Sequence, residues 1–118
     1  MSLNLTLPVP PSVNALYRAI GRGRNILSKE GRAWYEKAVP MAQQQAAGWF
    51  VLGKCELSFI VFFPDRRRCD ISNRIKALED GITKAGIWQD DSQVKRLVVE
   101  HGGVDKACPR VEVTITAL

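Results

Sequence analysis

The sequence predicts an α+β fold: a single small domain with a mixed β-sheet of about four strands and two main helices. Three observations lead to this expectation. Leucines alternate with polar residues at positions 3, 5 and 7, as in a half-buried strand, and the same alternation returns at residues 111–116. Between them, apolar residues recur from Ile71 at spacings of four and three, as on one face of a helix. The predicted elements follow in the order β-α-β-α-β-β. A chain of 118 residues has the length of a single domain, so we expect one domain over residues 1–118.

The N-terminal part predicts a strand followed by a loop. Leu3–Leu7 is the strand, and prolines from position 8 onward end it. Residues 12–25 hold two glycines among arginines, a composition typical of a loop.

The first helix is predicted from Lys29 to about Ala47, with Ser28 as its N-cap. Its apolar face consists of Trp34, Ala38, Met41 and Ala42. Pro40 is expected to kink or divide the helix, because proline removes a backbone donor and clashes with the preceding turn.

The C-terminal half predicts strand, helix, strand, strand. Residues 56–63 are apolar enough for a strand buried on both faces, and the helix from Ile71 ends at Gly86, a natural C-terminal cap. Residues 94–100 and 111–116 are the last two strands, joined by a hairpin around residues 102–109.

Composition excludes several classes of protein. Hydrophobic residues are 46% and charged residues 25%, which excludes a disordered tail or a collagen-like fibre. The longest apolar run, 59–63, is far too short to span a membrane, and no signal peptide is visible, so we expect a cytoplasmic protein. The three cysteines are widely spaced without a C-x-x-C motif, so neither a disulfide framework nor a zinc site is expected.

The charge balance points to a polyanionic partner. Seventeen Lys and Arg residues against twelve Asp and Glu give a net charge of +5 and a pI near 9.4. Ten of the cations are arginines, whose planar donors suit phosphate recognition.

Candidate chemistry concentrates around the second predicted helix. Asp70 with the pair Asp90 and Asp91 forms an oxygen-only ligand set of the kind that suits Mg²⁺ or Mn²⁺. Lys76 can add a positive charge near a phosphate, and the arginines at 66–68 can bind flanking phosphates. Such a set suits hydrolysis of a phosphodiester.

Each of these residues also has a simpler interpretation. Asp70 is a good helix N-cap, and Asp90-Asp91 is typical of a solvated turn. Lys76 can pair with Asp80 one turn away on the helix surface. The nuclease interpretation is favoured because these carboxylates lie in the most basic segment of the chain.

Two segments together resemble a known family. They read P-D-R-R-R-x-D-x-x-N-x-x-K from Pro64 to Lys76 and T-K-A-G-x-W-x-D-D-x-Q-V from Thr83 to Val94. In this pattern, and in P-P-S-x-N-x-x-Y-R at residues 10–18, the chain resembles the RusA family of Holliday junction resolvases. These are endodeoxyribonucleases of phages and prophages, and the resemblance covers nearly the whole chain.

The resemblance implies a homodimer that binds four-way junction DNA and nicks two opposing strands symmetrically, with Mg²⁺ or Mn²⁺, in recombination and repair. It implies Asp70 and Asp91 as catalytic metal ligands with Asp90 adjacent, Lys76 as catalytic lysine, and Asn73 as site support. The residues expected to bind DNA are Asn14, Arg18, Arg22, Arg24, Lys29, Arg66, Arg67 and Arg68.

One departure from the family pattern leaves the activity open. The family usually reads D-x-D-N where this chain has Asp70-Ile71-Ser72-Asn73, so Ser72 replaces a metal-site carboxylate. The consequences are weaker metal affinity, compensation by Asp90, or a non-catalytic protein that binds junctions. A basic regulatory or protein-interaction module is a third alternative.

Overall fold

A computed structural model describes residues 1–21, 23–67 and 70–118, without the side chains of residues 14, 24 and 25. The strands are β1 (Ser2–Leu7), β2 (Tyr17–Gly21), β3 (Arg24–Leu27), β4 (Cys55–Phe63), β5 (Val94–Val104) and β6 (Arg110–Ala117). The α-helices are α1 (Val13–Leu16), α2 (Lys29–Ala46) and α3 (Ile75–Lys84), and the 3-10 turns are η1 (Ser72–Arg74) and η2 (Asp91–Gln93).

The main sheet has four strands in the order β1-β6-β4-β5. β6 is antiparallel to both neighbours, whereas β4 and β5 run parallel, joined through α3. The predicted mixed sheet is therefore confirmed, as is the α+β class with two main helices. The predicted hairpin between the last two strands is wrong, because β4 lies between them.

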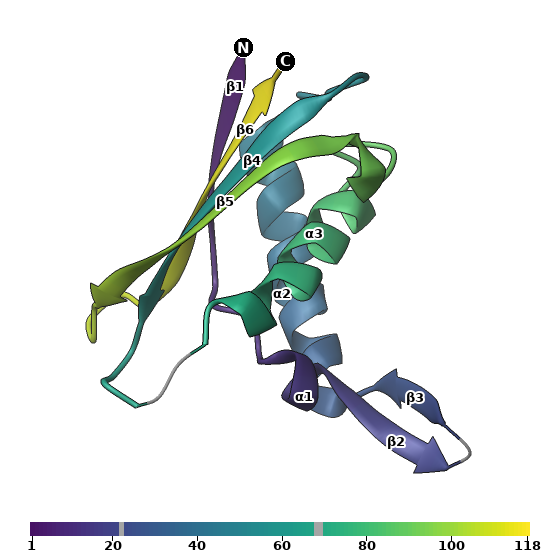
Figure 1. The fold of residues 1–118 in the computed structure, drawn as a ribbon, viewed down its shortest axis with the longest axis vertical. Coiled ribbons are helices and arrows are strands. Elements are labelled where there is room, and N and C mark those ends of the chain that lie inside the picture. The colour runs from purple at the N-terminus through teal and green to yellow at the C-terminus, as the bar shows by residue number, and fades with distance from the viewer. Residues whose placement is uncertain (22, 68–69) are drawn as a thin grey trace.

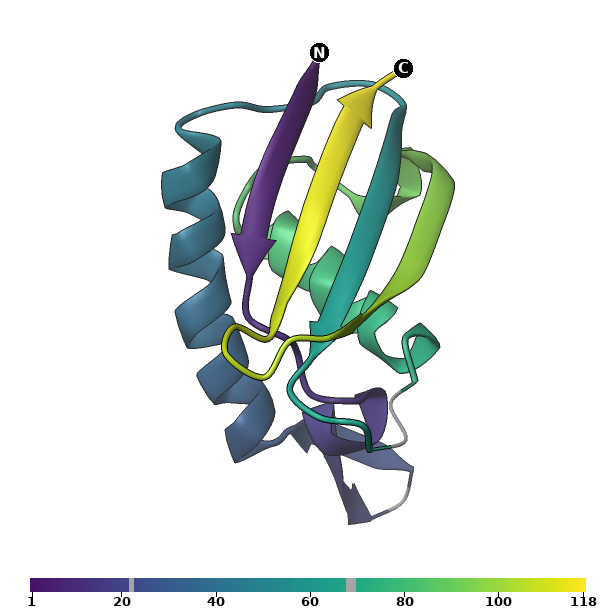
Figure 2. The same ribbon diagram turned by 90° about the vertical axis from the view of Figure 1, so that its left-hand side faces the viewer.

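Helices α2 and α3 cover one face of this sheet, and Figures 1 and 2 show the other face uncovered. Side chains of β1, β4 and β6 alternate between buried and less buried positions, so one side of each strand builds the core. The expectation that residues 56–63 are buried on both faces is thus wrong. Only the face toward the helices is fully buried, with Leu57, Phe59 and Val61 fully inaccessible.

α2 is well defined at both ends. The Ser28 hydroxyl accepts the amide hydrogen of Gly31 at 2.9 Å, and the helix ends at Ala47 in the left-handed region. Pro40 does not divide the helix, which continues through it to Ala46. The predicted face is largely confirmed, with Trp34, Ala38 and Ala42 buried.

The segment predicted as a loop is instead a short helix and a hairpin. β2 and β3 pair antiparallel, and Gly21 and Gly23 at the turn have φ of +98° and +72°, which non-glycine residues rarely adopt. The hairpin projects from the end of the molecule opposite both termini (Figure 1). No helix within the described ranges is long and apolar enough to cross a membrane.

Candidate active site

The helix that carries the site begins in a hydrogen-bonded turn centred on Asp70. Its Oδ1 accepts the Ser72 amide at 3.0 Å and the Ser72 hydroxyl at 2.6 Å, and its Oδ2 accepts from Asn73 Nδ2 at 3.3 Å. These bonds hold the 3-10 turn η1 that leads into α3. Asp70 is not the N-cap residue of η1 or of α3, whose N-cap positions are Ile71 and Arg74, but its carboxylate joins Ser72 and Asn73 in the turn before α3.

Ser72 has a definite role in this turn. Its hydroxyl donates to the carboxylate of Asp70. A second carboxylate at this position would have no hydrogen to donate and would repel the first. Ser72 therefore stabilises the turn by a hydrogen bond that an ionised aspartate at this position could not donate.

Lys76 lies in the first turn of α3 and is a fixed positive charge. Its Nζ is 3.3 Å from Oδ2 of Asp80, the ion pair expected from their spacing. The hydrogen bond with Asp80 raises the pKa of Lys76, with smaller contributions from Tyr17 and Asp91. The ion pair with Asp80 favours the protonated form of Lys76.

The two adjacent aspartates have different surroundings. Asp90 caps η2 by accepting the Ser92 amide at 3.3 Å, and hydrogen bonds from Ser92 lower its pKa. Gln93 completes this capping box and donates to the backbone carbonyls of Val51 and Gly53 at 3.0 and 2.9 Å. The carboxylate of Asp90 is thus already used to cap η2.

Asp91 is exposed and faces α3. The pKa of Glu79 on α3 is raised first by the burial of Glu79 and then by the negative charge of Asp91. The charge of Asp91 also makes a small contribution to the raised pKa of Lys76. The structure therefore brings Asp91 and Lys76 into electrostatic reach of one another. Within residues 1–21, 23–67 and 70–118, however, no three His, Cys, Asp or Glu side chains form a group able to hold a metal.

The predicted phosphate-binding cations that the structure describes come from the β2–β3 hairpin, the start of α2 and the segment after β4. These segments lie toward the end of the molecule opposite the termini, with the hairpin and the segment after β4 on opposite sides of it (Figure 1). Arg18, Lys29, Arg66 and Arg67 are exposed. Arg67 is held by Asp65, which accepts its backbone amide at 2.9 Å and lies 3.6 Å from its Nε. The predicted contacts of Arg22 and Arg68, and of the side chains of Asn14 and Arg24, lie outside the described residues.

Two further residues line this region and were not expected from the sequence. Ser12 and Arg74, with Asp70 and Asn73, line a cavity of about 410 Å³ at the start of α3. Arg74 follows the motif asparagine directly, but its sequence position does not show that the segment of Ser12 packs against it. Only the fold brings these segments together.

Comparison with known proteins identifies the family of this chain. The sequence profile of the family "Endodeoxyribonuclease RusA" matches residues 8–116. This chain belongs to the RusA family. Among its RusA relatives are the crossover junction endodeoxyribonucleases of Escherichia coli (strain K12) and Enterobacteria phage 82. Each is 37% identical over 115 residues, covering 98% of this chain and 94% of the relative.

Proposed function

We propose that this RusA-family chain is a crossover junction endodeoxyribonuclease that nicks four-way DNA junctions. The observation that carries the proposal is the acid and lysine set along α3, in a basic chain 37% identical to such nucleases. The set comprises Asp70 before the helix, Lys76 in its first turn and Asp91 beside it.

Asp70 and Asp91 would hold the divalent metal implied by the family resemblance. Carboxylate oxygens fit this role, since Mg²⁺ is usually bound by one or two carboxylates, with waters and substrate phosphates as its other ligands. When bound, such a metal activates water and neutralises the charge that develops on a phosphodiester. Asp90 is the weaker candidate because its carboxylate already caps η2.

Lys76 would place its ammonium against the phosphate that is cut. A lysine is charged at physiological pH, and the ion pair with Asp80 at 3.3 Å restrains the direction of the ammonium. A fixed cation at that point stabilises the extra negative charge of the transition state.

The exposed cations of the hairpin and of the segment after β4 would bind flanking phosphates without reading sequence. A homodimer suits the task, because two copies related by a two-fold axis present two identical sites to a two-fold substrate. Paired nicks would follow from that symmetry.

A second candidate, a protein that binds junctions without cutting them, is favoured by one observation. Ser72 stands where the family usually has a carboxylate, and its hydroxyl is already bonded to Asp70. The acid set has one negative charge fewer than expected, which weakens attraction for a cation.

The test is cleavage of a labelled mobile four-way junction in Mg²⁺, Mn²⁺ or EDTA, beside a duplex of the same sequence. Paired symmetric nicks that require metal support the proposal. Tight junction binding without nicks supports the second candidate, and equal binding of duplex and junction supports a basic interaction module.

Asp70→Asn assigns the role of the carboxylate. The amide oxygen of Asn can still accept the hydrogen bonds of Ser72, so the turn is retained while the charge is lost. We expect nicking to disappear and junction binding to remain. Glu100→Gln, an exposed carboxylate on β5, is the control and is expected to nick normally. Unfolding of Asp70→Asn would instead assign the residue a capping role alone.

A further inference from the structure

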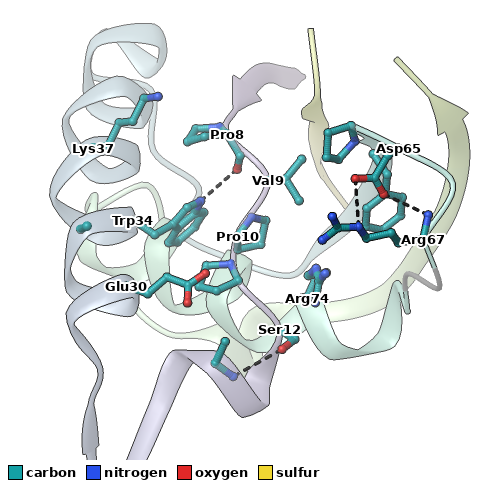
Figure 3. Close-up of a pocket in the computed structure, with 15 residues that line it drawn as sticks. Pro8, Val9, Pro10, Ser12, Glu30, Trp34, Lys37, Asp65, Arg67 and Arg74 are labelled. Atoms are coloured by element: carbon teal, nitrogen blue, oxygen red, sulfur yellow. Dashed lines mark hydrogen bonds and ion pairs between the residues drawn. The ribbon is translucent and has the colours of Figure 1, made fainter. Parts of the chain in front are cut away.

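A larger cavity of about 720 Å³ lies beside this site. It opens between the segment Pro8–Ser12, the N-terminal half of α2 and the segment that follows β4 (Figure 3). Its volume lies within the range of about 300–1,000 Å³ typical of small-molecule sites. The roles proposed above for the acids and lysines do not use this cavity.

One side of the cavity is apolar and rigid. Pro8, Val9 and Pro10 line it together with Trp34 and Phe63. The indole Nε1 of Trp34 donates to the Pro8 carbonyl at 3.0 Å, a bond drawn in Figure 3, which ties this segment to α2. Proline rings have few conformations to lose, so the wall is preformed for a flat, weakly polar group such as a base or a sugar.

The other side is cationic. Arg67 and Arg74 line it, with Lys37 across the opening on α2 (Figure 3). Glu30 and Asp65 also line the cavity, and Asp65 pairs with Arg67. Lys37 and Arg74 against Glu30 then leave a net charge of +1, which favours a ligand with an anionic group.

Arg74 carries the strongest indication of a missing partner. Its Nε atom is buried and has no hydrogen-bond acceptor within the described part of the chain. Its guanidinium carbon lies over the Phe63 ring, 5.7 Å from the centroid, at cation–π distance. A buried donor without an acceptor is unfavourable, and a turn of the Arg74 side chain, which lines both cavities, would bring it to a phosphate oxygen.

Arg74 also connects the cavity to the candidate active site. Together with Ser12 it lines the smaller cavity that includes Asp70 and Asn73. A strand whose phosphate lies at Asp70 would therefore place a neighbouring nucleotide at the opening of the larger cavity.

We propose that this cavity binds one unstacked nucleotide of the DNA strand that is cut. Arg74 binds its phosphate, and the wall of Pro8, Val9, Pro10 and Phe63 contacts its sugar and base. The inference rests on the proposed nuclease function and adds a nucleotide subsite to it. A proline-lined groove also suits a polypeptide, but the unsatisfied arginine and the cationic side favour a phosphate-bearing ligand.

The first experiment uses junctions with 2-aminopurine at successive positions around the point of nicking, bound in EDTA so that no strand is cut. Wild-type protein should raise the fluorescence at one position, because a base removed from the stack is no longer quenched. Ala33→Trp fills the cavity from an exposed position on α2, and Arg74→Met removes the phosphate contact. Both should abolish the signal and weaken binding about tenfold.

Matched controls separate the cavity from general effects. Gln44→Trp adds the same bulk to an exposed position of α2 outside the cavity, and Arg96→Met removes an arginine from β5. Both should keep the signal. The inference is overturned if wild-type protein binds junctions with no change at any position, or if Ala33→Trp keeps the full change.

A second experiment does not depend on junction cleavage. The Trp34 indole N–H reports on the cavity directly, and its NMR signal can be followed with dCMP, deoxycytidine or inorganic phosphate. A shift with dCMP that Arg74→Met removes supports the subsite even if the protein never nicks DNA, so failure of the nuclease proposal is distinguishable. A shift with a proline-rich peptide and none with dCMP overturns it.

Discussion

The ammonium of Lys76 is held 3.3 Å from the carboxylate of Asp80, one turn further along the same helix. Asp80 is the first cause of the raised pKa of Lys76, and its charge also contributes to the raised pKa of Tyr35. The charge of Asp80 thus acts on both the surface lysine and the buried Tyr35 of α2. We propose that Asp80 positions the Lys76 ammonium.

Replacing Asp80 by Asn should leave the protein folded but misdirect Lys76. A surface ion pair contributes at most about 0.5 kcal/mol to the free energy of unfolding, so the urea midpoint should barely move. Nicking should fall between about tenfold and a hundredfold, because misplacement of a reacting group is costly. Single-turnover cleavage measures this, and an unchanged rate would contradict the role.

Ser72→Asp should convert the turn before α3 into one that needs metal. It removes the hydroxyl that donates to Asp70 and puts a second carboxylate beside it, at a cost of about 1 kcal/mol or more without a cation. In EDTA the Tm should therefore fall, and Mg²⁺ should restore it and increase nicking. Ser72→Ala, which loses the bond without adding charge, should show no such recovery. Equal responses of the two variants to Mg²⁺ would refute the prediction.

Arg18→Gln on the projecting hairpin should reduce the salt dependence of DNA binding. Each phosphate contact contributes about 0.9 to the slope of log K against log salt, so the slope should drop by about that amount. Titrations at several salt concentrations measure it. Arg96→Gln on β5 is the control, and a slope equal to that of wild type would remove Arg18 from the interface.

Gly31→Ala should destabilise the protein although alanine is the better helix former. A Cβ atom there would lie 2.5 Å from the Leu16 carbonyl oxygen, because α1 and the start of α2 approach closely. The clash should outweigh the gain of about 1 kcal/mol in helix propensity and cost about 1–3 kcal/mol net. Urea unfolding tests the sign. Gly53→Ala, with open space around it, should change little.

Tyr35 should make the fold sensitive to alkali. Burial, then the charge of Asp80, raises its pKa above the ordinary value of 10.0. The folded state holds this proton more tightly than the unfolded state, so the associated stability is complete below pH 10.0 and is lost as pH rises through the higher folded value. Urea unfolding at increasing pH should show the loss. Tyr35→Phe should remove that part of the pH dependence, and an identical profile would contradict it.

Periodicity predicted the elements of this fold better than their arrangement. The alternation in β1 and β6 and the apolar spacing of α3 arise from burial on one side, which the sequence records directly. The pairing of β5 with β4 does not follow from local pattern. The long connection through α3 allows β5 to pair parallel with β4. β5 and β6 are joined by a short turn, yet β4 lies between them in the sheet.

The site was predictable to the extent that it is local. The turn from Asp70 to Asn73, the pair Lys76–Asp80 and the position of Asp91 after α3 all lie in one continuous segment. The capping role of Asp90 could be recognised only from the hydrogen bonds in the structure. The larger cavity was not predictable, because its walls come from segments more than fifty residues apart in the sequence.

The pairing of β1 with β6 has a consequence for folding. Ser2 of β1 is opposite Thr116 of β6, and β6 is also the antiparallel neighbour of β4. Contacts between such distant parts of a chain form slowly, because the long intervening segment must first be closed into a loop. We therefore expect β1 to join β6 late in folding, and the sheet that supports α3 to be complete only after that step.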